Sequence, residues 1–140
     1  MRAMATLDET WRRPAPHLRL VEDGADSELT EEERWEDYLC QLRTLVPFAT
    51  ALRARDLWGR LKLRFTELPL PIAGPHGEAE FQFAWNQANA YLDLELFADG
   101  SLAWTWLDRV HDTAEGEDGK RFGSLSPRFF EYLEQMGAKP

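Results

Sequence analysis

The most regular pattern in this chain of 140 residues is the alternation of apolar and polar positions over residues 80–108. Successive side chains of a β-strand point to opposite faces, so each alternating run predicts a strand with one apolar face. Three such runs follow one another, which predicts an antiparallel meander. The residues expected on its apolar face are Phe81, Phe83, Trp85, Leu92, Leu94, Leu96, Leu102, Trp104 and Trp106.

Turn residues separate the three runs. Residues 86–89 (NQAN) lie between the first two, and Asp99-Gly100 lies between the second and the third. Asp-Gly favours a tight hairpin because glycine readily adopts the positive φ that such a turn needs. The three runs are therefore expected to pair as consecutive hairpins.

A spacing of three to four residues predicts two helices before the meander. Thr30 and Glu33 form a capping box, which starts the first helix. Pro47 interrupts it and opens a second helix over residues 48–65, where Gly59 favours a kink or a break. The expected buried stripes are Trp35, Tyr38, Leu39, Leu42 and Val46 in the first helix, and Ala54, Leu57, Trp58, Leu61 and Phe65 in the second.

A third helix is expected at the end of the chain, over residues 127–136. Ser126 is a good N-cap, proline suits the first helical position, and Gly137 stops the helix. Its apolar residues are Phe129, Phe130, Leu133 and Met136.

The remaining segments read as connections. Residues 68–72 (LPLPI) predict an extended linker, 74–77 (GPHG) a turn, and 113–119 (TAEGEDG) an acidic loop. A short fourth strand is expected at 121–123. The predicted fold class is α+β, a three- to four-stranded antiparallel β-meander with helices packed on one face, in the order α-α-β-β-β-α.

Length and composition favour one domain. Residues 1–27 contain two prolines and an acidic end, and we expect a mobile N-terminal leader there, followed by a single α+β domain over residues 28–140. The one cysteine, Cys40, rules out an intramolecular disulfide and is expected to be buried beside the first helical stripe. No apolar run is long enough to span a bilayer, so the predicted location is the cytoplasm.

Charge is unevenly distributed along the chain. The formal net charge is −9, which disfavours direct binding to nucleic acid. Residues 43–64 run against this trend, with six basic residues and only Asp56 opposing them. Three interpretations of this basic segment stay open: it lies against acidic neighbours of the same chain, it meets an anionic partner, or it is solvated surface without a role.

Paired carboxylates are the strongest candidate for catalytic chemistry in this chain. Asp93 and Glu95 project from the same face of the middle strand, and paired carboxylates can hold a divalent metal or act as acid and base. No lysine on these strands could stabilise developing charge. The acidic residues 112–118 match neither a zinc pattern nor an EF-hand loop. No nucleophile elbow or phosphate-binding glycine loop occurs, so no catalytic residue, metal ligand or cofactor is expected.

The face of the meander opposite the apolar one combines acids with aromatic residues. This mixture could form a recognition surface for a protein partner, including one whose own surface is basic. The candidate binding residues are Glu80, Tyr91, Asp93, Glu95 and Phe97.

The segment 68–108 also resembles a pattern in small uncharacterised bacterial α+β proteins. Its elements are the proline-flanked extended segment 68–72, the glycine turn 74–77, a strand ending at Trp85, a Leu- and Glu-rich strand over 91–97, and the Asp-Gly turn. Proteins of this kind occur near mobile elements and defence loci. The resemblance implies an accessory or inhibitory role and assigns no functional residue.

The predicted function is therefore a non-enzymatic, protein-binding accessory or inhibitory module of a bacterial or phage system. Two alternatives of other classes remain open. One is an acidic mimic of nucleic acid that occludes a basic groove. The other is a metal-dependent enzyme that uses Asp93 and Glu95. No membrane contact is expected.

Overall fold

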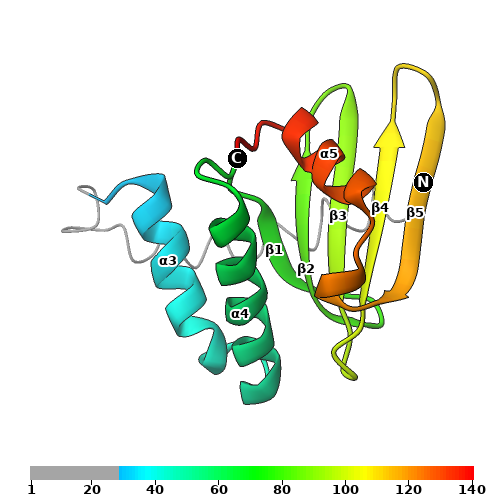
Figure 1. Ribbon diagram of the computed structural model, residues 1–140. Coiled ribbons are helices and arrows are strands. Elements are labelled where there is room, and N and C mark those ends of the chain that lie inside the picture. The colour runs from blue at the N-terminus through cyan, green and yellow to red at the C-terminus, as the bar shows by residue number, and fades with distance from the viewer. Residues whose placement is uncertain (1–28) are drawn as a thin grey trace.

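The computed structural model describes residues 29–140; the predicted leader lies outside the described residues. Two helices precede a sheet, and one helix follows it (Figure 1). In chain order the elements are α3 (Glu31–Gln41), the 3-10 turn η2 (Leu42–Thr44), α4 (Phe48–Arg64), β1 (Ile72–His76), β2 (Ala79–Asn86), β3 (Ala90–Leu96), β4 (Leu102–Asp108), β5 (Thr113–Lys120), the 3-10 turn η3 (Phe122–Ser124) and α5 (Pro127–Gln135).

The α+β class and the antiparallel sheet are confirmed, but the sheet has five strands instead of three or four. They lie in the order β1-β2-β3-β4-β5, so each strand pairs with its sequence neighbours. The predicted three-stranded meander forms β2, β3 and β4. Gly100, with φ +83°, makes the expected tight turn between β3 and β4.

Strand β1 corrects the prediction of a turn at residues 74–77. Ile72 pairs with Ala84 and Ala73 with Phe83, and the register shifts between Gly74 and His76. Proline donates no backbone hydrogen bond, and it is tolerated in sheets only at edges and bulges. Pro75 lies within that irregular part of an edge strand, which is why its presence did not exclude a strand.

Strand β5 corrects the prediction of an acidic loop at residues 113–119. Its side chains point alternately to the two faces of the sheet, but neither set is apolar, so the sequence shows no amphipathic strand pattern. On the side towards α5, Glu115 and Glu117 face polar partners on other elements, and Ala114 and Gly116 point the other way. The predicted fourth strand at 121–123 is also wrong, because this segment forms η3.

The helices follow the predictions closely. Thr30 and Glu33 exchange both bonds of the capping box, and Ser126 caps α5 through the amide of Arg128. Helix α4 runs without interruption through Gly59, where a kink or break had been expected. The residues predicted for the three apolar stripes are all buried. Cys40, expected to be buried, is exposed.

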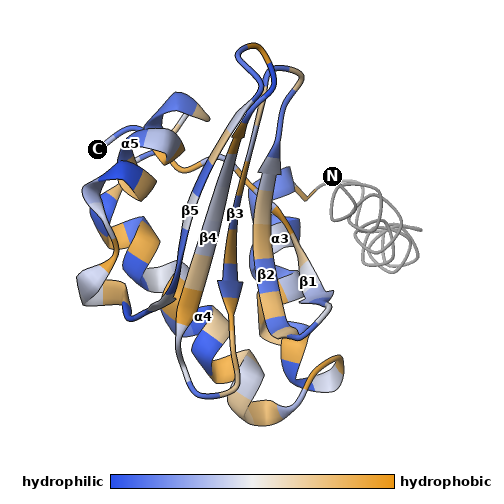
Figure 2. Ribbon diagram, turned by 90° about the vertical axis from the view of Figure 1, so that its right-hand side faces the viewer, coloured by the Kyte–Doolittle hydropathy of each residue, from blue (hydrophilic) through white to orange (hydrophobic). Residues whose placement is uncertain are grey.

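The core lies between the sheet and the helices, with α4 and α5 against one face (Figures 1 and 2). Trp35 of α3 and Trp58 of α4 meet Phe83 of β2, and Trp106 of β4 stacks on Tyr132 of α5 at 4.2 Å between ring centroids. We call this the helix-covered face. Every one of the nine residues predicted for it is buried.

All five tryptophans within residues 29–140 are core residues, which leaves none of these five for an exposed binding surface. None of the helices in that range combines the length and the apolar character needed to cross a bilayer.

Candidate functional site

The opposite side of the sheet, which we call the polar face, contains most of the predicted binding residues. Within residues 29–140 no helix packs on it. The register places Asp93 between Ala84 and Thr105, and Glu95 between Gln82 and Ala103. The polar face is formed by Gln82, Ala84, Tyr91, Asp93, Glu95, Ala103, Thr105 and Leu107.

Three polar side chains form a chain of hydrogen bonds across this face. Gln82 Nε2 donates to the Tyr91 hydroxyl over 2.9 Å, and that hydroxyl donates to Asp93 Oδ2 over 2.7 Å. Gln82, Tyr91 and Asp93 are only 1%, 2% and 6% exposed. Tyr91 and Asp93 had been expected on a recognition surface, and the structure instead buries them with Gln82 in a desolvated network.

Desolvation changes the acid–base properties of this network. Burial raises the pKa of Asp93 to about 7, and the charge of Glu95 adds to the effect, while the Tyr91 hydroxyl and the Thr105 amide oppose it. Burial also raises the pKa of Glu95 and, together with the nearby Asp93, that of Tyr91. A carboxyl in this setting is ionised only when a positive or donating group compensates for its lost hydration.

Two acceptor atoms of the network have no such group within residues 29–140. Gln82 Oε1 and Asp93 Oδ1 are buried, and neither accepts a hydrogen bond from the part of the chain that the structure describes. A buried acceptor without a donor costs about 1–3 kcal/mol, so native structures contain few of them.

Glu80 and Phe97, the other two predicted binding residues, lie apart from this network. Glu80 Oε1 accepts bonds from Thr50 Oγ1 and Arg53 of α4, both over 2.6 Å, and these bonds lower the pKa of Glu80. Glu80 therefore binds side chains of α4 and takes no part in the hydrogen bonds of the polar face. Phe97 lies just beyond the end of β3, in the turn to β4, and is half-buried.

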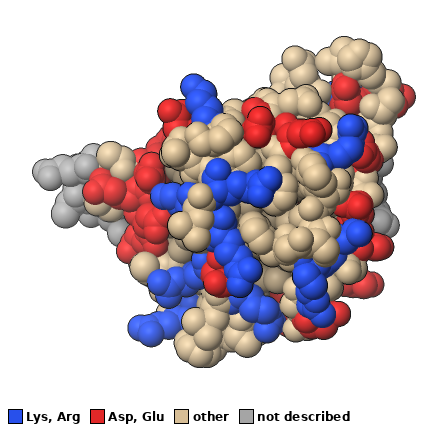
Figure 3. Space-filling view, in the orientation of Figure 1, with Lys and Arg blue, Asp and Glu red and all other residues tan. Residues whose placement is uncertain are grey.

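A different site lies on the helix side of the molecule, where basic residues gather. Figure 3 shows Lys and Arg side chains over α4, with acidic side chains towards the periphery. A groove of about 230 Å³ opens there between α4, the β3–β4 turn and η3. We call it the arginine groove; it is lined by Arg53, Asp56, Leu57, Arg60, Leu96, Gly100, Leu102, Arg121 and Phe122.

Each of the three arginines is anchored by an acceptor of the protein itself. Arg53 donates to Glu80 over 2.6 Å, Arg60 Nε to Asp56 Oδ2 over 2.9 Å, and an Arg121 terminal nitrogen to the Asp99 carbonyl over 2.8 Å. Arg53 Nε is buried and has no partner within residues 29–140. Because a guanidinium has five donors, these anchors fix the groups and leave donors for a ligand.

The groove has an apolar floor beneath these charges. Leu57, Leu96 and Leu102 are buried, and the half-buried ring of Phe122 lies 5.7 Å from the guanidinium carbon of Arg60. Gly100 eases this arrangement, since a Cβ at this position would lie 3.0 Å from the terminal nitrogen of Arg121 and the arginine would have to shift slightly. The turn glycine predicted from the sequence thus also shapes a site that the sequence did not reveal.

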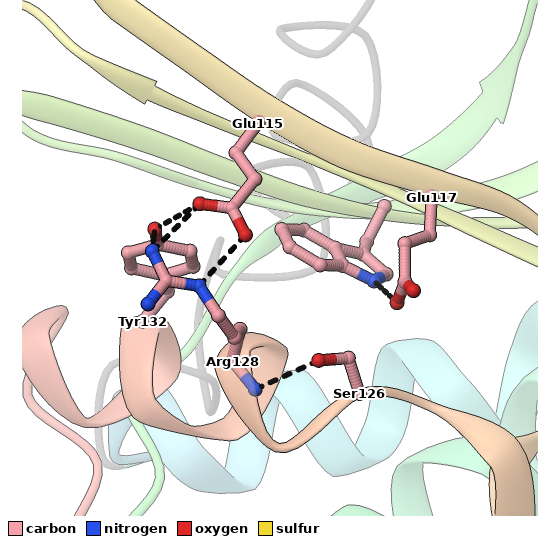
Figure 4. Close-up of polar contacts among 6 residues, drawn as sticks. Glu115, Glu117, Ser126, Arg128 and Tyr132 are labelled. Atoms are coloured by element: carbon pink, nitrogen blue, oxygen red, sulfur yellow. Dashed lines mark hydrogen bonds and ion pairs between the residues drawn. The ribbon is translucent and has the colours of Figure 1, made fainter.

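A third polar cluster joins β5 to α5 (Figure 4). Arg128 forms a bidentate pair with Glu115, both bonds being 2.7 Å, and Tyr132 also donates to Glu115. Trp104 Nε1 donates to Glu117 over 2.9 Å. Each of these side chains is hydrogen-bonded to another member of the cluster. The cluster is therefore a structural connection between the edge strand β5 and helix α5.

No set of three or more potential metal ligands occurs within residues 29–140, including the acidic segment 112–118. Sequence reasoning identified Asp93, Glu95 and Tyr91 and detected the basic character of α4. It missed Gln82 as part of the network, and it missed Arg121, whose place beside α4 depends on distant contacts. Scans against family models, curated proteins and solved structures found no match to this chain.

Proposed function

We propose that this protein is a non-enzymatic binding module that recognises an acidic segment of a protein partner through the arginine groove. The observation that carries the proposal is the combination of three anchored arginines with an apolar floor in one groove. Bidentate arginine–carboxylate bonds give directional recognition, and the leucine floor offers a place for an apolar side chain next to the acids.

The surroundings favour a short acidic segment over a long polyanion. The net charge of −9 repels extended polyanions such as nucleic acid at long range. Asp56, Glu80 and the exposed Asp99 also flank the groove, so the favourable potential is confined to a small area. A peptide with a few carboxylates fits this confined charge better than a phosphate backbone does.

An accessory or inhibitory module of a bacterial or phage system would act through stoichiometric binding of this kind. We place it in the cytoplasm, because a single cysteine is the usage expected of a reducing compartment.

Fluorescence anisotropy with a labelled peptide of alternating Asp and Leu residues tests the proposal. We expect saturable binding to the full chain that weakens as salt screens the charges. The double variant Arg60→Glu/Arg121→Glu should lose about tenfold or more in affinity, equivalent to about 1.4 kcal/mol.

Arg43→Glu is the matched control, since Arg43 is exposed on η2 and does not line the groove. It makes half the charge change of the double variant and should alter affinity little. Equal losses per reversed charge in the two proteins would mean that only net charge matters. Tighter binding of a single-stranded oligonucleotide than of the peptide would also contradict the proposal.

A further inference from the structure

A second, smaller pocket adjoins the arginine groove at η3. It has a volume of about 170 Å³ and shares Phe122 with the groove. We call it the Phe130 pocket; it is lined by Arg64, Phe122, Gly123, Leu125, Pro127 and Phe130. Pockets for drug-sized ligands span about 300–1,000 Å³, so this volume suits a single side chain.

The lining of the Phe130 pocket combines apolar groups with one cation. Leu125 and Phe130 are buried core residues, and Phe122 is half-buried. Arg64, the last residue of α4, is exposed, and its guanidinium carbon lies 3.7 Å from the centre of the Phe130 ring. An arginine on a ring uses the face of its guanidinium for that contact, so the N–H donors in the guanidinium plane stay available.

Arg64 differs from the three arginines of the groove, because no acceptor within residues 29–140 holds its guanidinium. Of the acids nearest to it in the sequence, Asp56 pairs with Arg60 over 2.9 Å. Glu67 pairs with Lys139 over 3.7 Å. The Phe130 pocket therefore offers a charged donor group directly beside an apolar space.

We infer that the Phe130 pocket receives the C-terminal residue of the acidic partner segment, with its apolar side chain in the pocket and its α-carboxylate on Arg64. This inference rests on the proposed function of the arginine groove. Only the last residue of a chain carries an apolar side chain and a carboxylate on the same carbon. An internal leucine would present a neutral amide to Arg64, and an internal aspartate would leave the apolar space unfilled.

The spacing of the arginines on α4 also sets the position of the acid in the partner segment. Arg60 and Arg64 are four residues apart, which is about 6 Å along the helix. Two residues of an extended chain cover about 6.6 Å, and residues two apart point to the same side. In a segment that runs along α4, an acid two residues before the C-terminus therefore reaches Arg60.

The test compares two forms of one labelled peptide, Leu-Asp-Leu-Asp-Ser-Leu, with a free C-terminal carboxylate or with a C-terminal amide. Binding to the full chain is measured by fluorescence anisotropy at one salt concentration. We expect the free acid to bind about fivefold more tightly, because the amide cannot accept the charged bidentate bond. Replacing the last leucine of the free acid by serine should weaken binding about tenfold, since the apolar burial is lost.

Arg64→Gln should bring the free acid and the amide to nearly the same affinity, leaving only the screened effect of one net charge. Arg55→Gln is the matched control. Arg55 is exposed on the same helix, its substitution changes the charge equally, and it lines neither the arginine groove nor the Phe130 pocket. This variant should keep the fivefold preference for the free acid.

The outcomes separate this inference from the proposed function. If the amide binds as tightly as the free acid and both still depend on Arg60 and Arg121, the inference is wrong and the arginine groove remains the binding site. A preference for the free acid that persists in Arg64→Gln also overturns the inference, because the carboxylate then lies elsewhere on the protein. If neither peptide binds saturably, the proposed function fails, and this inference fails with it.

Discussion

The two faces of the same sheet solve burial in different ways. On the helix-covered face, Phe83 and Trp104 lie among other aromatic and aliphatic side chains, and the removal of apolar surface from water is the favourable term. On the polar face, Gln82, Tyr91 and Asp93 are buried to a similar extent but depend on hydrogen bonds. Two acceptor atoms of this group have no donor within residues 29–140. The first face is stabilised by apolar burial, whereas the second holds these two buried acceptors.

The largest effect is expected on the helix-covered face. Phe83→Ala removes a ring that contacts Trp35, Trp58 and Phe81 at centroid distances of 5.4–6.1 Å. We expect the free energy of unfolding to fall by about 3–5 kcal/mol, because transfer energy is lost and a cavity remains. Urea unfolding measures it. A loss below about 1 kcal/mol would mean that this face is not the main source of stability.

The next effect concerns the titration of Asp93. Burial raises its folded pKa from 3.8 to about 7, so the folded state binds this proton more tightly than the unfolded state does. Wild-type stability therefore falls as pH rises from about 4 to about 7, because the unfolded chain loses the proton first. Asp93→Asn lacks this titration.

The advantage of Asp93→Asn over wild type should thus be smallest near pH 4, grow through this interval and level off above about pH 7. Its upper limit is about 4 kcal/mol, since each pKa unit corresponds to about 1.4 kcal/mol. Unfolding curves at several pH values measure it, with Asp118→Asn on exposed β5 as the control. An advantage that does not change with pH would show that Asp93 is not desolvated in the folded state.

The third prediction concerns the close approach of the backbones of β4 and β5 at Gly116. A Cβ on Gly116 would lie only 2.4 Å from the Trp104 carbonyl oxygen, so Gly116→Ala must push β5 away from β4. We expect a loss of about 1–3 kcal/mol, the usual cost of overpacking. Gly123→Ala in η3 is the control, because nothing lies within 4 Å of the Cβ it would add. Equal losses in the two variants would point to a general glycine effect instead.

Strand β5 also shows what could not be predicted from the sequence. Alternation and helical spacing identified the meander and the helices, because apolar surface must be buried on one side of each element. Strand β5 is an edge strand without an apolar face. Its inward carboxylates are satisfied by Arg128 and Trp104 on other elements. Local patterns do not record such pairings, so the strand resembled a loop.

The binding sites follow the same rule. The spacing of Arg53 and Arg60 by seven residues already puts them on one side of a helix. Arg121 joins them through its bond to the Asp99 carbonyl, in the turn between β3 and β4 that lies 22 residues earlier in the chain. On the polar face, parity correctly grouped Asp93 with Glu95, but it gave no sign that Asp93 would be desolvated, since burial depends on the whole tertiary structure.

The smallest effect compares the same chemical change on the two faces. Tyr91→Phe removes the hydroxyl that joins Gln82 to Asp93, and it leaves the polar atoms of both without that partner in a buried site. Tyr132→Phe removes a hydroxyl from Glu115, which keeps both of its bonds to Arg128. A buried group left unsatisfied costs about 1–3 kcal/mol, whereas a typical hydrogen bond contributes about 1 kcal/mol net.

We therefore expect Tyr91→Phe to destabilise the protein more than Tyr132→Phe, by about 1 kcal/mol, in parallel urea unfolding at neutral pH. Tyr91→Phe should also raise the pKa of Asp93 further, because the hydroxyl bond is the strongest of the interactions that lower it. The ¹³C NMR signal of the Asp93 carboxyl carbon, followed as pH is varied, reports this directly. If the two variants are equally stable and the Asp93 signal does not move, Gln82, Tyr91 and Asp93 do not form a cooperative network of hydrogen bonds.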